Sequence, residues 1–573
     1  MMVNAGTLTI KNGAQIASTT AGPGDGGTVQ VVAQGPLTLT DPGTKITASS
    51  TANGNAGSVM VGAPQITIAG GAEISSTTAG LGNGGSVDVT TPGALVLDGM
   101  GVRRTRIAAS ADLGALGRAG ELTVAAGNLT IRGGAQIASS TAGPGRGGDV
   151  GVMVANGVSL SGTGPDGASG ITTSAEPGSS GDAGQVVLKA GGAIALSGGA
   201  EVASSTAGAG KGGTVQVVTQ GALTLSDPLS GIVASTTSSG NAGSVMVGAP
   251  QIRIAGGAEI SSTTAGLGNG GSVDVTTPGA LVLDGMAVGG TRIAASADQG
   301  SLGEAGDVTV TAGNLTVQGG AQIASSTAGP GKGGNVNVTV TSDILLPDLG
   351  PQITARSTGS GDAGSVTVSA ARLLMNNGSA ISTEAEQSTA NARNITINVR
   401  DFLYLVSSTI TTSVSNKTGS GGNITIDPQF LILNHSSIIA EAIEGNGGNI
   451  TISAGQYIPS ADSIVSASSQ LGISGNVVIS GPRVDVNGAL VVLSSELRSA
   501  AQVLRTSCAA QTTRPQSSLV EAGRGGLPQD PEATLPALYI AGRDVDSHLE
   551  AAAGTTEAKS TLQTRAHLTM HCG

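Results

Sequence analysis

The feature that most constrains this chain is a short glycine-rich motif that recurs along most of its length. The motif reads Gly-x-Gly/Ala-Gly-x-Val/Ile-x-Val/Ile/Leu, and with degenerate copies it occurs 16 times at intervals of 26 to 36 residues. Repetition at such a period indicates a repeat protein in which each unit contacts only its neighbours. The copies span 24–31, 54–61, 82–89, 117–124, 145–152, 181–188, 210–217, 240–247, 268–275, 303–310, 331–338, 361–368, 390–397, 419–426, 445–452 and 472–479.

A longer period is superimposed on the short one. Residues 54–99 recur almost unchanged at 240–285, an offset of 186 residues, and residues 127–148 recur at 313–334 with the same offset. A block of six short units has therefore been duplicated within the chain.

Each unit contains three short segments in which apolar and polar residues alternate. In the unit that starts at residue 54 they are VMV (59–61), ITI (66–68) and EISSTT (73–78). Period-2 alternation predicts strands, and the Gly, Pro, Asn and Asp residues between the segments predict turns. Such short strands form no stable hairpin sheet by themselves, but they fit three faces of a coil that stacks on the next coil. The sequence predicts an all-β, parallel β-helix of about 16 coils over 1–490, on the order of 75 Å long.

The composition indicates a narrow interior. The chain has 94 glycines, 1% aromatic residues and no Trp, so Val, Ile, Leu and Ala must fill the core in place of large rings. All the aromatic residues come after residue 400, where we expect the last coil to be closed and its edge covered. They are Phe402, Tyr404, Phe430, Tyr457 and Tyr539.

From about residue 490 the pattern changes, and residues 491–573 are predicted to form a short, partly helical C-terminal tail. A helix is predicted over 494–508, capped by Ser495, with a second, weaker helix at about 545–568. The stretch 523–536 is rich in Gly and Pro and is predicted to be irregular. The helical spacing of the first segment is carried by Leu497, Ala500, Ala501 and Leu504.

The only two cysteines of the chain, Cys508 and Cys572, both lie in this tail. In an exported protein such a pair usually forms one disulfide, and the alternative is two unrelated thiols. His567, His571 and Cys572 are the best candidates for metal ligands, because two His residues at i and i+4 can share a helix face. No fourth ligand is in view, so a solvated tail without metal is the preferred interpretation, and no cofactor is predicted.

Charge and hydropathy limit the partners of the chain. The net charge is −12 without a basic block, so nucleic acid is not an expected partner. No stretch of about 18 apolar residues exists, and hence no membrane-spanning helix is predicted. The first residues, MMVNAGTLTI, lack the basic and apolar regions of a signal peptide. We expect that the start of a longer architecture is missing.

Candidate catalytic carboxylates are not distinguished from structural ones by the sequence. Glu73, Glu201 and Glu259 occupy a slot that Gln fills in other units, at residues 15, 136 and 322. A slot that exchanges Glu and Gln within one chain is a poor candidate for a general acid, so these residues are interpreted as interchangeable surface positions and the chain is not expected to be an enzyme. The cluster Arg103, Arg104 and Arg106 is interpreted as a solvated loop. This loop and residues 161–180 are expected to protrude from the rod.

Two further patterns leave alternatives open. Ser/Thr-rich runs recur at 18–22, 76–80, 139–143, 204–208, 262–266 and 325–329. They are predicted to be corner turns held by hydroxyl groups, and the alternative is a flat hydroxyl face that binds ice or mineral. Potential N-glycosylation triplets begin at Asn128, Asn314, Asn394, Asn423 and Asn449, but strand alternation by itself also produces them.

Two parts of the sequence resemble the filamentous haemagglutinin-like exoproteins of two-partner secretion. These parts are the glycine-rich units such as GNAGSVMV and GNGGNITI over about 5–490, and the tail LRTSCAAQTTRPQSSLVEAGRGGLPQDPEATLPALY at 504–539. The resemblance implies a right-handed parallel β-helix, export through an outer-membrane β-barrel transporter, and a role at the cell surface in adhesion, aggregation or biofilm formation. It also implies that Cys508 and Cys572 could close a loop that anchors the chain. The N-terminal secretion domain of that family has no counterpart here.

Overall fold

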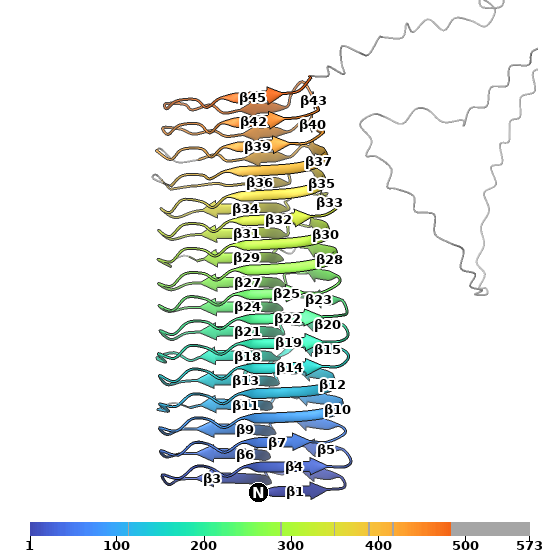
Figure 1. Cartoon of the computed structure of the whole chain (residues 1–573), viewed down its shortest axis with the longest axis vertical. Helices are drawn as coiled ribbons and strands as arrows, with labels where there is room; N and C mark the ends of the chain where they lie inside the picture. Colours follow the sequence, from blue (N-terminus) through green and yellow to red (C-terminus); the bar gives the residue numbers. More distant parts are fainter. Residues whose placement is uncertain are drawn as a thin grey trace, which may run out of the picture. The chain divides into compact units, whose positions relative to one another are not determined.

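A computed structural model describes residues 1–482 of the chain, apart from residues 103, 113, 287–288, 299, 349, 388–389 and 415–417. By its internal contacts the chain divides into two units, Met1–Val491 and Val492–Gly573, and the description concerns the first. This unit is a parallel β-solenoid whose described residues form 45 strands and no helix (Figure 1). The predicted all-β, parallel fold is confirmed, whereas its right-handedness stays a prediction. The predicted tail helices at 494–508 and 545–568 lie outside the described residues.

Each turn of the solenoid contributes one strand to each of three stacks, which we call the first, second and third stacks in chain order. One complete turn consists of β7 (Val59–Gly62), β8 (Ile66–Ala69) and β9 (Glu73–Thr78). Every strand of these stacks pairs in parallel with its equivalent in the next turn, for example Val59 with Val87 and Ile66 with Leu95.

The first and second stacks belong to one 27-stranded sheet. Six long strands join them by running through the corner between the stacks: β10 (Val87–Asp98), β12 (Leu122–Arg132), β28 (Val273–Asp284), β30 (Val308–Gln318), β35 (Val366–Asn376) and β37 (Ile395–Val406). The other strands of the first stack are β1 (Met2–Ala5), β4 (Val29–Ala33), β14 (Val150–Val154), β19 (Val186–Ala190), β22 (Val215–Thr219), β25 (Val245–Gly248), β32 (Val336–Val340), β39 (Ile424–Asp427), β42 (Ile450–Ser453) and β45 (Val477–Ser480). Those of the second stack are β2 (Leu8–Ile10), β5 (Leu37–Leu39), β15 (Val158–Ser161), β20 (Ile194–Ser197), β23 (Leu223–Leu225), β26 (Ile252–Ala255), β33 (Asp343–Leu346), β40 (Phe430–Asn434) and β43 (Gln456–Pro459).

The third stack is a separate 16-stranded sheet, and therefore the described chain makes 16 full turns. The first motif copy opens the second turn, and the last opens only β45. Besides β9, the strands of this stack are β3 (Gln15–Thr20), β6 (Lys45–Ser50), β11 (Arg106–Ala111), β13 (Gln136–Thr141), β18 (Gly170–Ala175), β21 (Glu201–Thr206), β24 (Gly231–Thr236), β27 (Glu259–Thr264), β29 (Arg292–Ala297), β31 (Gln322–Thr327), β34 (Gln352–Ser357), β36 (Ala380–Ser382), β38 (Thr409–Thr411), β41 (Ser437–Ile439) and β44 (Ile464–Ser466).

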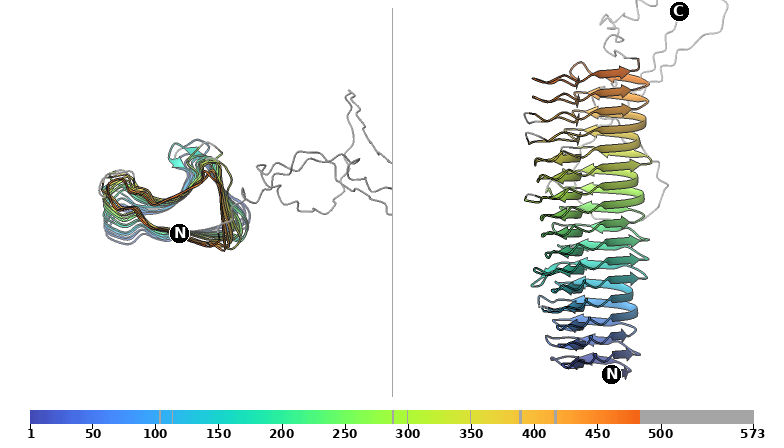
Figure 2. Two further views of the ribbon diagram at one scale, coloured as in Figure 1. Left: turned by 90° about the horizontal axis from the view of Figure 1, so that it is seen from above. Right: turned by 60° about the vertical axis from the view of Figure 1, so that its left-hand side comes forward.

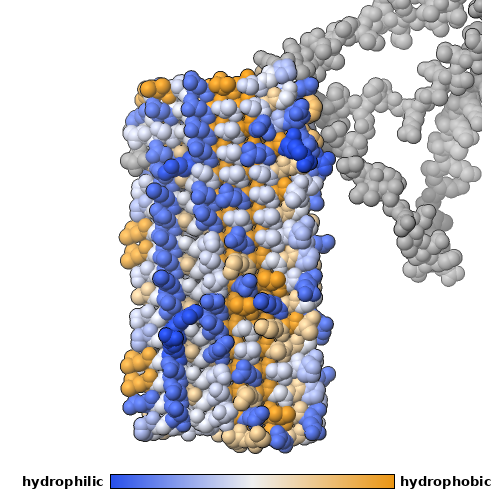
Figure 3. Space-filling view, in the orientation of Figure 1, coloured by the Kyte–Doolittle hydropathy of each residue, from blue (hydrophilic) through white to orange (hydrophobic). Residues whose placement is uncertain are grey.

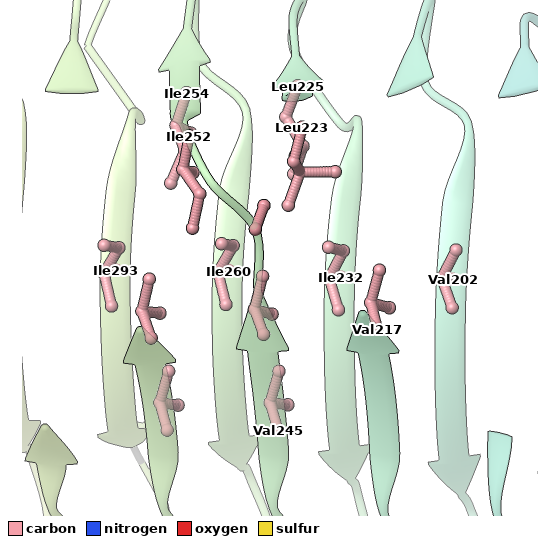
Figure 4. Close-up of a cluster of buried hydrophobic side chains, with 14 of the residues drawn as sticks. Val202, Val217, Leu223, Leu225, Ile232, Val245, Ile252, Ile254, Ile260 and Ile293 are labelled. Carbon is pink, nitrogen blue, oxygen red and sulfur yellow. The ribbon is translucent and has the colours of Figure 1, made fainter. Parts of the chain in front are cut away.

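The core is a set of aliphatic columns that run along the solenoid. On the third stack Val202, Ile232, Ile260 and Ile293 follow one another on neighbouring strands, all fully buried. They face Val and Leu side chains of the other two stacks, such as Val217 (Figure 4). Stacked turns lie ~4.8 Å apart, so each inward position must accept its own copy above and below, and β-branched side chains do so well.

Glycine is required where the motif turns approach each other. A methyl group at Gly145 would collide with the carbonyl oxygen of Gly117 in the turn below, and the same holds for Gly82 against Gly54. Their φ angles are not in the left-handed region, so close backbone approach accounts for the motif glycine.

The expected protruding loops are only partly confirmed. Residues 163–168 form a small antiparallel hairpin, β16 (Thr163–Gly164) and β17 (Gly167–Ala168), outside the turn, whereas 170–175 belong to β18. This hairpin stands out from the otherwise superimposed turns (Figure 2). It meets the arginine loop, because the Arg104 backbone N–H donates to Asp166 Oδ2 at 2.5 Å.

Three of the described aromatic residues do not close the last turn as expected, and Tyr539 lies outside the described residues. Phe402 and Phe430 are neighbours in register on β37 and β40, and both alternate with fully buried leucines. Together with Tyr404 they therefore lie on the outside of the second stack. Of the described aromatic side chains only Tyr457 is buried, with 8% exposed.

Candidate functional site

A column of charged and amide side chains is formed by the first residues of the third-stack strands from β3 to β34. Strand register brings together residues 28 to 34 positions apart in sequence, so the Glu and Gln slots recognised in the sequence do stack. The column reads Gln15, Lys45, Glu73, Arg106, Gln136, Gly170, Glu201, Gly231, Glu259, Arg292, Gln322 and Gln352.

Glu73 is the centre of a three-residue ion network in this column. Its Oε1 lies 3.0 Å from Arg106 Nη2, and its Oε2 lies 3.3 Å from Lys45 Nζ. Only 2% of Glu73 is exposed, whereas each cation keeps about a third of its side chain in solvent. The interpretation of Glu73 as a surface position was therefore wrong. Arg106 was also wrongly placed in a solvated loop, because it opens strand β11.

The 186-residue duplication repeats half of this network. Arg292 Nε donates to Glu259 Oε2 at 2.6 Å, six turns above the Arg106–Glu73 pair. The position equivalent to Lys45 is Gly231, so Glu259 has a cation on one side only.

Neighbouring residues in the column shift the pKa values of two carboxyl groups, Glu73 and Glu201, in opposite directions. Burial by itself raises the pKa of Glu73, but the charges of Arg106 and Lys45, with hydrogen bonds from Ser75 and Arg106, outweigh burial and lower that pKa. Glu201 lies between two glycines, and its pKa is raised by burial and by the charge of Glu259. The same slot thus holds one carboxyl group whose pKa is lowered and one whose pKa is raised.

One aspartate lies near each copy of the network and interacts with its charges. Asp112 follows β11, and Asp298 follows β29 at the 186-residue offset. Burial raises the pKa of both, and the carboxylates of Glu73 and Glu259 raise them further, against the opposing arginines. Acid–base chemistry uses one carboxyl group with a raised pKa and one with a lowered pKa. Both aspartates are partly covered by neighbouring groups but remain exposed at the surface.

Hydroxyl groups of the Ser/Thr-rich runs point inward at every second position and hold the corner turns, as predicted. Thr141 Oγ1 donates to the Gly145 carbonyl at 2.8 Å, and Ser139 Oγ accepts from the Gly148 N–H. The outward positions form one column of hydroxyls over eleven turns: Thr19, Ser49, Thr77, Ser110, Ser140, Ser174, Ser205, Ser235, Thr263, Ser296 and Ser326.

The motif turns carry ladders of amide and carboxylate side chains. The Asn83 N–H donates to Asn55 Oδ1 at 2.8 Å, and the Arg118 N–H donates to Asn83 Oδ1 at 2.9 Å. A hydrophilic stripe runs along the solenoid on the side of these turns (Figure 3). Three glycosylation triplets belong to such a ladder, since the side chains of Asn394, Asn423 and Asn449 accept backbone N–H groups of the next turn.

The remaining sequence candidates fall in two groups. Cys508, Cys572, His567 and His571 lie outside the described residues, as does Arg103. Within the part of the chain that the structure describes, no three His, Cys, Asp or Glu side chains come close enough together to hold a metal ion. An open hollow of about 930 Å³ between the second and third stacks is lined mostly by glycines, with Asp348, Asn377 and Ser407.

The chain was compared with known proteins. No protein family, no curated protein and no solved structure matches it. None of the described segments forms a helix long and apolar enough to cross a membrane.

Proposed function

We propose that this chain is a secreted or cell-surface structural rod of the adhesin type, which mediates attachment, aggregation or biofilm formation. The observation that carries the proposal is the repetition of one surface six turns apart. The Glu73–Arg106 and Glu259–Arg292 pairs are copies on the same face of one stack, about 29 Å apart. A rigid rod that presents two related sites binds a repetitive surface with avidity.

Export is proposed by the resemblance to filamentous haemagglutinin-like exoproteins, with an outer-membrane β-barrel transporter as the partner. The test is fractionation of the native host into outer membrane, medium and cytosol, probed with an antibody against the repeats, with and without reductant. Material in the medium or outer membrane is the expected result, and a reductant-sensitive mobility shift would reveal a Cys508–Cys572 disulfide. Chain found only in the cytosol would contradict the proposal.

Two alternatives have a specific observation behind them. A β-helical carbohydrate-active enzyme is favoured by the oppositely shifted carboxyl groups Glu73 and Asp112, and it predicts release of reducing ends from polysaccharides that Glu73→Gln abolishes. An ice- or mineral-binding solenoid is favoured by the hydroxyl column of the third stack, in which all members but Ser110 and Ser296 reach solvent, and it predicts thermal hysteresis that Ser140→Lys reduces. Attachment without either activity supports the structural rod.

A further inference from the structure

The tips of the motif turns form two exposed columns along one edge of the solenoid. The tip column contains Leu81, Leu116, Pro144, Ser180, Ala209, Ser239, Leu267 and Leu302, from eight consecutive turns. Two residues further on, the neighbouring column contains Asn83, Arg118, Arg146, Asp182, Lys211, Asn241, Asn269 and Glu304. All sixteen residues are exposed, and the four leucines are 53% to 59% exposed.

Backbone hydrogen bonds between turns fix these columns. The Leu116 N–H donates to the Gly80 carbonyl at 3.1 Å, and the Leu302 N–H donates to the Gly266 carbonyl at 3.2 Å. Seen along the solenoid, the turns overlie one another with a progressive offset (Figure 2). In the space-filling view, two apolar patches stand at the left edge of the molecule, separated by paler turns (Figure 3).

The tip column has nearly the same character when read from either end. Two leucines stand at each end, and four smaller residues lie between them. A two-fold axis that passes between Ser180 and Ala209, perpendicular to the rod, reverses the column. It sets Leu81 opposite Leu302 and Leu116 opposite Leu267 of a second molecule, and each of these contacts occurs twice. An interface of this isologous kind closes after two copies.

We propose that this edge binds a second copy of the chain in antiparallel orientation. The leucines bury against each other at both ends, and the small central residues let the two edges approach. The same axis places Asp182 opposite Lys211 in the neighbouring column, so the charges are complementary at the centre. This inference goes beyond attachment and holds whether or not the rod is an adhesin.

The interface is narrow, because eight turns span only about 34 Å and each turn contributes one or two side chains. We therefore expect a dimer that dissociates in the micromolar range rather than an obligate one. Sedimentation velocity of the full chain over a concentration series measures it. Leu116→Ser combined with Leu267→Ser should weaken association about tenfold or more. Leu229→Ser, at a leucine that is 77% exposed elsewhere on the solenoid, should leave association unchanged.

Cysteine cross-linking tests the orientation. In a full chain that carries Cys508→Ser and Cys572→Ser, Leu116→Cys molecules mixed with Leu267→Cys molecules should form disulfide-linked heterodimers. Neither variant alone should cross-link, because residue 116 faces residue 267 and not its own copy.

Three results would overturn the proposal. The first is a chain that remains monomeric at its highest soluble concentration. The second is a Leu116→Cys variant that cross-links with itself as well as with its counterpart. The third is a monomeric chain that sediments with phosphatidylcholine vesicles in a leucine-dependent way, since the partner of the edge would then be a lipid surface. None of these results bears on export or attachment, so the proposed function is tested separately.

Discussion

At the scale of single residues, the neighbour in the next turn decides what a position tolerates. The sequence identifies the Glu and Gln slot of the third stack correctly, because equivalent residues follow the same motif at the same distance. It does not predict that Glu73 is buried, since that depends on Lys45 and Arg106, which are 28 and 33 residues away in sequence. The opposite pKa shifts of Glu73 and Glu201 arise in the same way.

The first prediction concerns the motif glycines. Gly145→Ala should lower the free energy of unfolding by several kcal/mol, on the order of 3, because its methyl group meets a backbone carbonyl that cannot move alone. Gly151→Ala is the matched control, since nothing lies within 4 Å of a methyl group there. Urea denaturation measures both variants, and equal stability of the two would contradict the close-approach argument.

The second prediction concerns the carboxyl groups of the charged column. Glu73→Gln should destabilise the solenoid at neutral pH by about 1–3 kcal/mol, because it leaves two partly buried cations without a counter-ion. The pKa of Glu73 is lowered in the folded chain, so its contribution is present above the unfolded pKa and is lost as pH falls through the folded pKa. The cost of the substitution should therefore vanish in acid.

Glu201→Gln should have the opposite effect. The pKa of Glu201 is raised in the folded chain, so folding is favoured below the unfolded pKa and this advantage is lost as pH rises through the folded pKa. At neutral pH the substitution removes a disfavoured charge, and it should be neutral or stabilising. Thermal unfolding of both variants at several pH values measures these effects. If both substitutions changed the stability in the same direction at neutral pH, the opposite pKa shifts would be refuted.

At the scale of elements, the strand and the motif turn next to it form the unit on which stability depends. The strands and their order could be predicted because period-2 alternation repeats in every unit. The joining of the first and second stacks through β10 and β12 could not, because the Pro-Gly and Ala-Gly pairs at those corners resemble ordinary turns in sequence. The placement of the aromatic residues failed for a related reason: Phe402 and Phe430 pack on the outside, and the narrow core is filled by aliphatic residues.

The third prediction concerns the hydroxyl clamp of the corner turns. Thr141→Val keeps the shape of the side chain but removes the bond to the Gly145 carbonyl, at a cost of about 1–2 kcal/mol. Amide hydrogen exchange should accelerate over residues 143–148 and remain slow in the flanking strands. Thr130→Val, on the outward side of β12, is the control and should leave exchange in that turn unchanged.

At the scale of the whole molecule, the duplication makes the solenoid modular. Val87 and Val273 are equivalent positions, each paired with the same residue type in the turn before it. The length of the rod could be predicted from the number of motif copies. The 186-residue offset makes the second Glu–Arg pair a copy of the first, but the pairing itself was found only in the structure. The predicted tail, with Cys508 and Cys572, lies outside the described residues.

The fourth prediction uses this modularity. Deletion of residues 87–272 joins equivalent positions and should give a folded ten-turn rod, because stability is a sum over neighbouring turns. If attachment depends on two equal sites, beads coated with the deleted chain should detach from a target surface under flow far more than twofold faster than beads with the full chain. Detachment only about twofold faster would contradict avidity. Loss of the β-sheet circular dichroism signal would show that the joined chain does not fold.

The parallel stacking of the strands also sets how the molecule responds to pulling. The hydrogen bonds between turns lie along the solenoid axis, so a load on its two ends opens one terminal turn at a time instead of shearing all turns together. Each opened turn of about 30 residues releases roughly 100 Å of extended chain. We therefore expect the solenoid to lengthen under tension in steps of similar size. The turns that remain stacked keep their surface intact.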